Sequence, residues 1–366
     1  MSDAIRVVGM MSGTSMDGID VAEVVTDGIT VQEFGATAYV PYTDDERQIL
    51  RRAMGQWEGL HVRAAAKLVT RLHARAFAVL DAGAVDLIGS HGQTLAHDPD
   101  NRRTLQVGDG VQLARDTGHP VVWDFRSADV ALGGQGAPLA PFFHFACAKY
   151  IGASEPIAFL NLGGVGNITY VDPRLDDVTV PKAVLAFDTG PANAPLNDFM
   201  MDRFGQAYDV NGALAATGTP DMDVVRRFLN APYFRKLPPK SLDRNSFSQI
   251  SELVTHMNDA DSAATLCAII AATVTTGMEH MPVPVSEVLV CGGGRHNPVI
   301  TSMLRAGLGV PVHAVEQHGL NGDMLEAQAF AYLAARVLNK RPTSGPSTTG
   351  APVFIGGGEF SLPIAT

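Results

Sequence analysis

Residues 9–22 read GMMSGTSMDGIDVA and join two apolar, β-branched runs through a short polar turn. The run before the turn, residues 5–8, and the run after it, residues 19–25, predict two strands. Glycine, serine and aspartate, which separate the two runs, are residues that favour tight turns. The stretch therefore predicts a strand–turn–strand hairpin.

The tip of this hairpin offers backbone N–H groups, hydroxyls and a carboxylate. Successive N–H groups in such a turn form a concavity that binds anions, and a carboxylate can hold Mg²⁺ through water. The candidate phosphate-binding residues are Gly13, Thr14, Ser15, Met16, Asp17, Gly18, Ile19 and Asp20, with Asp17 as the candidate Mg²⁺ ligand through water. An ordinary β-hairpin with turn-forming residues is the alternative.

Residues 161–169, NLGGVGNIT, repeat this pattern in the second half of the chain. Apolar runs at 156–162 and 168–171 predict two strands around a glycine-rich turn. Two such turns can hold a polyphosphate, and Gly163, Gly164 and Asn167 are the candidate contacts. A pair of unrelated tight turns is the alternative.

Length and composition narrow the class of protein. A chain of 366 residues predicts two domains. The net charge of −11 argues against a nucleic-acid partner or a polybasic membrane surface. Cys147, Cys267 and Cys291 are far apart and lie in apolar runs, which predicts buried thiols. No apolar run approaches 18 residues, so we expect no membrane partner and a cytoplasmic protein.

Strands and helices alternate along most of the chain. The predicted strands include 30–39, 85–89, 104–107, 121–123, 183–187 and 287–290, and the predicted helices include 44–54, 61–80, 110–117, 192–204, 262–281 and 325–338. Two α/β domains that face each other across a central cleft are the simplest architecture. We expect domain 1 at 1–130 and domain 2 at 131–339. The tail from 341 to 358 predicts an irregular surface segment, and 340–366 is a candidate to pack back on domain 1.

Asp188 is the candidate general base. It ends the predicted strand 183–187 and is followed by the turn residues TGPAN. A carboxylate delivered by a buried strand into such a turn is held in place, and it can take a proton from a hydroxyl or a water. The alternative is that Asp188 caps the helix that begins at Ala192.

Polar residues at the ends of two predicted strands in the first half suit a sugar-like ligand. The candidates are His91, Gln93 and Thr94 in SHGQT, which follows strand 85–89, and Asp124 and Arg126, which follow strand 121–123. Arg126 can donate to a ligand carboxylate from two nitrogens. The alternative is an internal ion pair between Asp124 and Arg126 with a core histidine.

Three further segments carry candidate ligand contacts. Gln135 lies in a glycine-rich loop, and Glu326 opens the helix 325–338, where pairing with the helix dipole is an alternative role. Gly292, Gly293 and Gly294 link a strand to a predicted helix start, so a flat ring can approach the backbone there. A tight strand-to-helix connection is the alternative reading of the three glycines.

Several nucleotide and catalytic signatures do not occur. The sequence contains neither GxxxxGK[ST] nor GxGxxG, which argues against a P-loop or a Rossmann dinucleotide site. It also lacks GxSxG, HExxH and CxxC. ATP, if bound, is therefore expected at the paired hairpin turns.

The chain resembles the 1,6-anhydro-N-acetylmuramic acid kinases of bacterial cell-wall recycling. The matching strings are GMMSGTSMDGIDVA, SHGQT, VVWDFR, GGQGAPL, NLGGVGNIT, FDTGPANAPLND, PPKSLDRNSF, VCGGGRHNP and EAQAFAYLA, in family order from residue 9 to about residue 335. Two segments depart from the family pattern: GPAN at 190–193 replaces GPGN, and Ser241 is followed by Leu242, Asp243 and Arg244.

The resemblance implies an actin/Hsp70/hexokinase-type fold with MgATP between two domains, and a homodimer. It implies 13–20 as the first phosphate loop, 161–169 as the second, and 292–294 near the nucleoside. It also implies that Asp188 deprotonates a water that attacks the anomeric carbon of the anhydro amino sugar. The released O6 would take the γ-phosphoryl group, giving N-acetylmuramate 6-phosphate.

Three other functions stay open at this point. A kinase of another anhydro sugar, such as levoglucosan, would share Asp188 and both phosphate loops. A nucleotide-dependent interaction protein of the actin or Hsp70 type would hydrolyse ATP without any sugar. A Mg²⁺-independent hydrolase with a pair of carboxylates would leave the paired phosphate loops unexplained.

Overall fold

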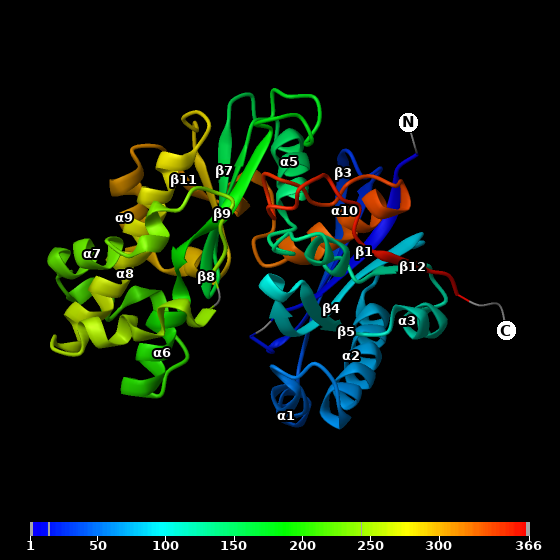
Figure 1. Cartoon of the computed structure of the whole chain (residues 1–366), viewed down its shortest axis with the longest axis horizontal. Helices are drawn as coiled ribbons and strands as arrows, with labels where there is room; N and C mark the ends of the chain where they lie inside the picture. The colour runs from blue at the N-terminus through cyan, green and yellow to red at the C-terminus, as the bar shows by residue number, and fades with distance from the viewer. Residues whose placement is uncertain (1–2, 14, 243, 364–366) are drawn as a thin grey trace. The chain divides into compact units, whose positions relative to one another are not determined.

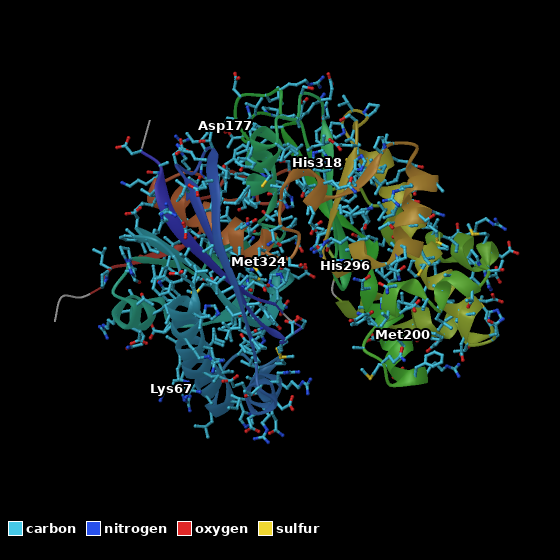
Figure 2. All side chains as sticks on the ribbon, turned by 180° about the vertical axis from the view of Figure 1, so that it is seen from behind. Lys67, Asp177, Met200, His296, His318 and Met324 are labelled. Carbon is cyan, nitrogen blue, oxygen red and sulfur yellow. The ribbon has the colours of Figure 1, made fainter. Side chains whose placement is uncertain are left out.

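The computed structural model describes residues 3–13, 15–242 and 244–363, which form two α/β units (Figure 1). The first unit holds the chain up to Gly152, a short return at Asp177–Thr179 and the chain from Met324 onward. The second unit holds Ala153–Asp176 and Val180–Asp323. Asp177 and Met324, both labelled in Figure 2, mark the two points where the chain re-enters the first unit.

One mixed sheet forms the centre of the first unit. Its strands are β1 (Ile5–Ser12), β2 (Gly18–Thr26), β3 (Val31–Pro41), β4 (Leu87–Asp98), β5 (Arg103–Val107), β6 (Val121–Trp123) and β12 (Glu359–Ser361). The order is β12-β6-β4-β1-β2-β3, with β5 paired to β4. Strands β1, β2 and β3 are antiparallel, whereas β1, β4 and β6 are parallel.

The sheet of the second unit has the same core order. Its strands are β7 (Ile157–Leu162), β8 (Val165–Val171), β9 (Val184–Pro191), β10 (Val288–Cys291) and β11 (Val312–Ala314), in the order β11-β10-β7-β8-β9. Here too an antiparallel trio, β7-β8-β9, is followed by parallel strands β10 and β11. Each unit therefore opens with a hairpin, and the expected α/β fold class is confirmed.

Two opposed glycines seat the last helix on the first sheet. Gly9 of β1 pairs with Gly89 of β4. A Cβ on Gly9 would lie 1.8 Å from the carbonyl oxygen of Ala327, and a Cβ on Gly89 would lie 2.2 Å from that of Phe330. Both carbonyls belong to α10 (Leu325–Leu338), whose many alanines also allow close approach. The helix backbone therefore rests directly on the sheet.

On the other face of β1 and β4, side chains pack into an apolar core together with α2 (Leu60–Val79). Val8 and Met10 of β1 share this core with Leu68 and Leu72 of α2. The helix α1 (Asp44–Ala53) begins with a capping box and packs on α2. Helices α3 (Gly110–Thr117), α4 (Ser127–Ala131) and α5 (Pro141–Tyr150) complete the first unit.

The core of the second unit is built around α8 (Asp259–Gly277). A Cβ on Gly190 of β9 would lie 2.8 Å from the Cβ of Thr273, so this glycine permits close packing of the helix on the sheet. The residues 259–280 are long and apolar enough to cross a membrane, but 72% of their most apolar window is buried, as in a core helix. Helices α6 (Asn193–Phe204), α7 (Met222–Leu229) and α9 (Pro298–Leu308) pack beside it.

The unit boundaries differ from the expected division at 130 and 339. Helix α5 lies in the first unit because it packs on β3 and α10, and α10 lies there because it packs on β1, β2 and β4. The segment after α10 also belongs to the first unit. Cys147, Cys267 and Cys291 are buried.

Candidate functional site

The first glycine-rich turn lies where the sequence predicted it, between β1 and β2. Ser15 Oγ donates to Asp17 Oδ1 at 2.8 Å, and the Met16 N–H donates to the Gly13 carbonyl at 3.1 Å. The Asp17 side chain is exposed on this turn, whereas Gly18 and Ile19 are buried in β2 and Asp20 pairs with Met11 across the hairpin. Thr14 lies outside the described residues.

A buried hydrogen-bond relay anchors the start of this turn. Ser12 Oγ donates to the carbonyl of Gly92 at 2.9 Å and lies 3.3 Å from His73 Nε2, while His73 Nδ1 lies 2.9 Å from Ser90 Oγ. Because the Ser12 proton goes to Gly92, Nε2 of His73 carries the proton that Ser12 accepts. Burial lowers the pKa of His73 to about 4, so its ring is neutral. Ser12 belongs to the first glycine-rich stretch but was not singled out as a contact, and His73 was missed because it belongs to no motif.

SHGQT lies inside β4 instead of following a strand end, because β4 runs on to Asp98. Gln93 Nε2 donates to the Gly13 carbonyl at 3.0 Å, which places Gln93 at the first glycine-rich turn. Thr94 Oγ1 accepts from Gln106 Nε2 at 3.2 Å.

His91 and Arg126 are brought together. Arg126 Nε donates to His91 Nε2 at 2.9 Å, and His91 Nδ1 donates to the Gly92 carbonyl at 2.8 Å. Burial, with the nearby charge of Arg126, holds the pKa of His91 well below its usual value, so the ring is neutral. Both ring nitrogens are engaged, and His91 therefore holds Arg126 in place.

Arg126 is a half-buried cation whose charge is influenced by Glu326. Burial lowers the pKa of its guanidinium to about 10, which leaves it charged at neutral pH, and the negative charge of Glu326 opposes that shift. The Arg126 guanidinium carbon lies 5.9 Å from the ring centroid of Phe330. Glu326 is exposed in the first turn of α10, where its charge favours both the charged form of Arg126 and the helix dipole.

Asp124 and Gln135 have separate partners. Asp124 Oδ1 accepts from Ser127 Oγ at 2.6 Å, so the expected alternative of an Asp124–Arg126 ion pair is not what the structure shows. The Gln135 N–H donates to the Thr349 carbonyl at 2.7 Å, and the Gln135 carbonyl lies 2.9 Å from His97 Nε2.

Asp188 lies within β9, opposite Asn167 of β8, because the strand continues to Pro191. Its Oδ2 accepts from the Leu242 N–H at 2.7 Å. Its backbone carbonyl accepts from Tyr233 OH at 2.5 Å, and its N–H donates to the Lys240 carbonyl at 2.9 Å. Burial raises the pKa of the carboxyl to about 7, and the Leu242 N–H opposes this rise. The carboxyl does not cap α6, whose N-cap position is Ala192.

The second glycine-rich turn is held by the segment after β9. The Ala192 N–H donates to the Gly164 carbonyl at 3.1 Å, and the Asn193 N–H donates to the Gly163 carbonyl at 2.8 Å. Asn193 Nδ2 donates to the Leu162 carbonyl at 2.8 Å. The methyl group that distinguishes Ala192 from the family glycine is buried.

The triple glycine lies beside the second turn. Gly292 has a φ of +73°, and a Cβ there would lie 2.2 Å from Asn161 Oδ1. A Cβ on Gly294 would lie 2.6 Å from the Cβ of Leu162. Arg295 fixes the segment by donating from NH1 to the Gly292 carbonyl at 3.0 Å. The second unit thus gathers the second turn and the triple glycine in one place.

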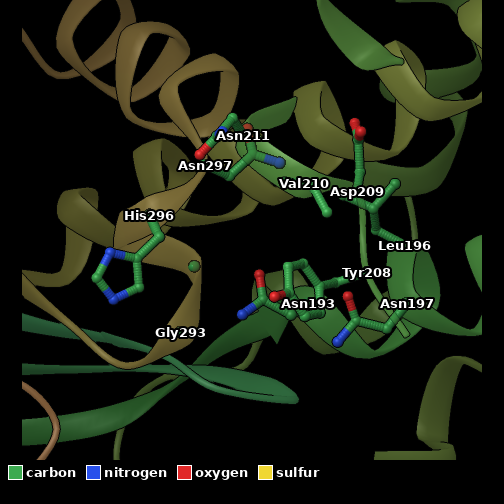
Figure 3. A pocket seen from close by; sticks show the side chains of 11 residues that line it. Asn193, Leu196, Asn197, Tyr208, Asp209, Val210, Asn211, Gly293, His296 and Asn297 are labelled. Atoms are coloured by element: carbon green, nitrogen blue, oxygen red, sulfur yellow. The ribbon is translucent and has the colours of Figure 1, made fainter. Parts of the chain in front are cut away.

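A pocket of about 410 Å³ opens beside these glycines (Figure 3). It is lined by Asn193, Leu196, Asn197, Tyr208, Asp209, Val210, Asn211, Gly293, Gly294, His296 and Asn297. Figure 3 shows the Tyr208 ring and the side chains of Asn193 and Asn197 on one side, with Asn297 across from them. Of these lining residues, only the glycines were singled out from the sequence as nucleoside contacts, and residues 208–211 belong to none of the quoted motifs.

The part of the chain that the structure describes contains no group of three or more His, Cys, Asp or Glu side chains arranged to hold a metal ion. Mg²⁺ is commonly bound by one or two carboxylates together with substrate phosphates. Asp17 is exposed on the first turn, so it is compatible with Mg²⁺ binding by one carboxylate together with substrate phosphates.

Comparison with known proteins agrees with these observations. A family model described as anhydro-N-acetylmuramic acid kinase matches residues 5–358. An anhydro-N-acetylmuramic acid kinase of Ruegeria sp. is 58% identical over 99% of this chain and 96% of its own. One of Roseobacter denitrificans is 56% identical over 98% and 95%.

Among solved structures, component A of the (R)-2-hydroxyglutaryl-CoA dehydratase of Acidaminococcus fermentans has a TM-score of 0.43 at 14% identity, over 90% of this chain and 99% of its own. The match of the family model over nearly the whole chain shows the family, and the relatives are kinases by name. The chain belongs to the anhydro-N-acetylmuramic acid kinase family and is an enzyme of the phosphotransferase class.

Proposed function

We propose that this kinase opens 1,6-anhydro-N-acetylmuramic acid with water and phosphorylates its O6, giving N-acetylmuramate 6-phosphate for cell-wall recycling. ATP supplies the γ-phosphoryl group. The observation that carries this proposal is the Asp188 carboxyl, which is held by the Leu242 N–H and has a pKa raised to about 7 by burial. A carboxylate whose pKa lies near the working pH is ionised in a large part of the molecules, and it binds a proton more strongly than an ordinary carboxylate does.

In the proposed reaction, hydrolytic ring opening and phosphoryl transfer are coupled through O6. Asp188 takes a proton from a water, whose oxygen bonds to the anomeric carbon while the bond from that carbon to O6 breaks. The O6 electron pair attacks the γ-phosphorus, and ADP leaves. The proton on Asp188 then passes to solvent. Phosphoryl transfer needs mainly positioning and neutralisation of charge, so the remaining residues have to hold the reactants.

Each glycine-rich turn is a proposed phosphate contact. In the first unit these contacts are residues 13–20, with Asp17 facing Mg²⁺ through water. In the second unit they are Gly163, Gly164 and Asn167. The anchoring of Gly13 by Gln93 and of Gly164 by the Ala192 N–H supports this role, because a turn held in advance loses little entropy on binding.

The pocket beside the triple glycine is the proposed nucleoside site. Its volume of about 410 Å³ falls in the range of small-molecule pockets. Tyr208 is 57% exposed and Val210 is 52% exposed, which leaves flat apolar surface for a base. The amides of Asn193 and Asn197 offer donors and acceptors to a base or a ribose.

The proposed sugar contacts are His91, Gln93, Thr94, Asp124, Arg126, Gln135 and Glu326. Arg126 is the proposed partner of the lactyl carboxylate, because a half-buried guanidinium held in place by His91 favours a planar anion. His91 acts by orienting Arg126. We also propose a homodimer in the cytoplasm, which sedimentation and cell fractionation would test.

The test is ADP release with MgATP and 1,6-anhydro-N-acetylmuramic acid. Wild type is compared with Asp188→Asn and with Asp176→Asn, a matched change at an exposed carboxylate. We expect sugar-dependent ADP release in wild type and Asp176→Asn, and its loss in Asp188→Asn. Turnover that survives in Asp188→Asn would exclude Asp188 as the base. Wild type without sugar-dependent turnover would exclude the proposed function.

A further inference from the structure

The segment after α10 is not the surface segment that its composition predicts. The side chains of Thr343, Ser344, Thr348 and Thr349 are all buried, none more than 2% exposed. A buried hydroxyl without a hydrogen-bond partner is costly. The partners of these hydroxyls therefore indicate what the segment does.

Two of the hydroxyls meet on one buried carboxylate. Ser344 Oγ and Thr349 Oγ1 donate to Asp129 Oδ2 at 2.5 and 2.6 Å. The other oxygen, Oδ1, accepts from the Gly136 N–H at 2.7 Å. Asp129 has no exposed surface, so these three donors replace the water that its charge would otherwise bind.

The same carboxylate shapes the glycine-rich loop that contains Gln135. The Gly134 N–H donates to the Asp129 carbonyl at 2.9 Å, and the Gln135 N–H donates to the Thr349 carbonyl at 2.7 Å. A Cβ on Gly134 would lie 2.1 Å from Asp129 Oδ1, so only glycine allows this approach. The loop is thus fixed by backbone hydrogen bonds to Asp129 and to the C-terminal segment.

The loop in turn holds Arg126. The Gly136 carbonyl accepts from Arg126 NH1 at 2.6 Å, while Gly136 donates its N–H to Asp129. Arg126 and Asp129 are three residues apart at the start of α4, which places them on the same side of that short helix. The hydroxyls of Ser344 and Thr349 hold Asp129, and Asp129 holds Gly136. Through Gly136, these hydroxyls therefore set where the Arg126 guanidinium lies.

We propose that Asp129, with Ser344 and Thr349, is a positioning group that holds Arg126 and Gln135 for the sugar. This inference rests on the proposed function, in which Arg126 binds the sugar carboxylate. Without the Thr349 hydroxyl, Asp129 loses a donor and the loop at 134–136 loosens. Affinity for the sugar falls, whereas the nucleoside pocket, built from other residues, is unaffected.

The test compares Thr349→Val with Thr348→Val. Both remove one buried hydroxyl from adjacent positions, but the Thr348 hydroxyl bonds only within the segment, to Gly345. We expect Thr349→Val to raise the KM for 1,6-anhydro-N-acetylmuramic acid about tenfold, as for loss of a hydrogen bond to a charged group. The KM for ATP should change less than about twofold in both variants.

Equal KM values for the sugar in both variants, or a parallel rise of the two KM values in Thr349→Val, would overturn the proposal. Amide hydrogen exchange gives a second readout that needs no turnover. We expect faster exchange at residues 134–136 in Thr349→Val than in Thr348→Val, and equal exchange would also overturn the proposal. If wild type consumed no ATP in the presence of the sugar, the proposed function would be excluded. The role of Asp129 in holding the loop would still be tested by the exchange measurement.

Discussion

Arg126 donates from Nε to Nε2 of His91, and the 2.9 Å bond requires a histidine ring that is neutral and protonated on Nδ1. His91→Ala removes this acceptor and frees the guanidinium to rotate. We expect the KM for the sugar to rise about tenfold or more, since hydrogen bonds to charged groups contribute roughly 1.5–3 kcal/mol.

His91→Gln is the matched variant, because a glutamine amide can donate to the Gly92 carbonyl and accept from Arg126. It should recover much of the affinity. If steady-state kinetics gave the same KM for His91→Ala and wild type, Arg126 would not depend on His91.

The pH profile of turnover should report Asp188. Its pKa of about 7 means that the carboxyl becomes protonated, and loses its function as a base, as the pH falls below 7. We expect kcat/KM to fall by up to about tenfold per pH unit on the acid side. A profile flat from pH 5 to 8 would contradict this assignment.

Asp188 should also lower the stability of the fold. Its folded pKa lies above its unfolded value, so between about pH 4 and pH 7 the folded state holds a proton that the unfolded state has released. The stability of wild type therefore falls as the pH rises through this window. Asp188→Asn should unfold at a higher temperature than wild type at pH 7.5, with a smaller difference at pH 4.5, as calorimetry can measure.

His73 should make the first unit sensitive to acid. Burial lowers its folded pKa to about 4 from 6.5, so the unfolded state binds a proton first as the pH falls. The stability that the neutral ring provides is present above pH 6.5 and is lost down to pH 4, a change of up to about 3 kcal/mol.

Denaturant unfolding at several pH values would show this loss, and His73→Gln should flatten the curve between pH 6.5 and 4. His61→Gln is the control for the substitution itself, because it makes the same change at an exposed position.

The geometry at Gly292 gives a matched pair of glycine variants. Gly292 and Gly309 have similar φ values, +73° and +68°, but a Cβ meets Asn161 Oδ1 only at Gly292 and open space at Gly309. Gly309→Ala should therefore cost only the backbone strain, about 1–2 kcal/mol. Gly292→Ala should destabilise more and raise the KM for ATP several-fold. If Gly292→Ala and Gly309→Ala changed the free energy of unfolding and the KM for ATP equally, the close packing at Gly292 would be contradicted.

Local sequence patterns predicted most of the helices and strands, but not all of the elements against which they pack. Helices α3 and α10 have the bounds that the sequence predicted. Helix α5 was missed because it is apolar on all sides, with its residues from Pro141 to Ala148 buried, so it shows no amphipathic period. Its place in the first unit depends on packing against distant elements, which no local pattern records.

In the candidate site, too, residues with a local sequence signal were predicted and residues that depend on distant contacts were not. The glycine turns were predicted because turn residues leave a local signal, and Asp188 was singled out because it follows an apolar run. His73, Asp129 and Tyr208 were missed, since each has its role only through residues far away in the chain. The strand-end positions of SHGQT and Asp188 were wrong because both strands continue through polar residues.

The seating of α10 on Gly9 and Gly89 has a consequence for biosynthesis. The second unit is encoded almost without interruption between Ala153 and Asp323, whereas the sheet of the first unit needs a helix from residues 325–338 to cover one face. Chains emerge from the ribosome N-terminus first, and domains fold as units. The half of the protein that is translated first is therefore completed last, after the second unit has left the ribosome.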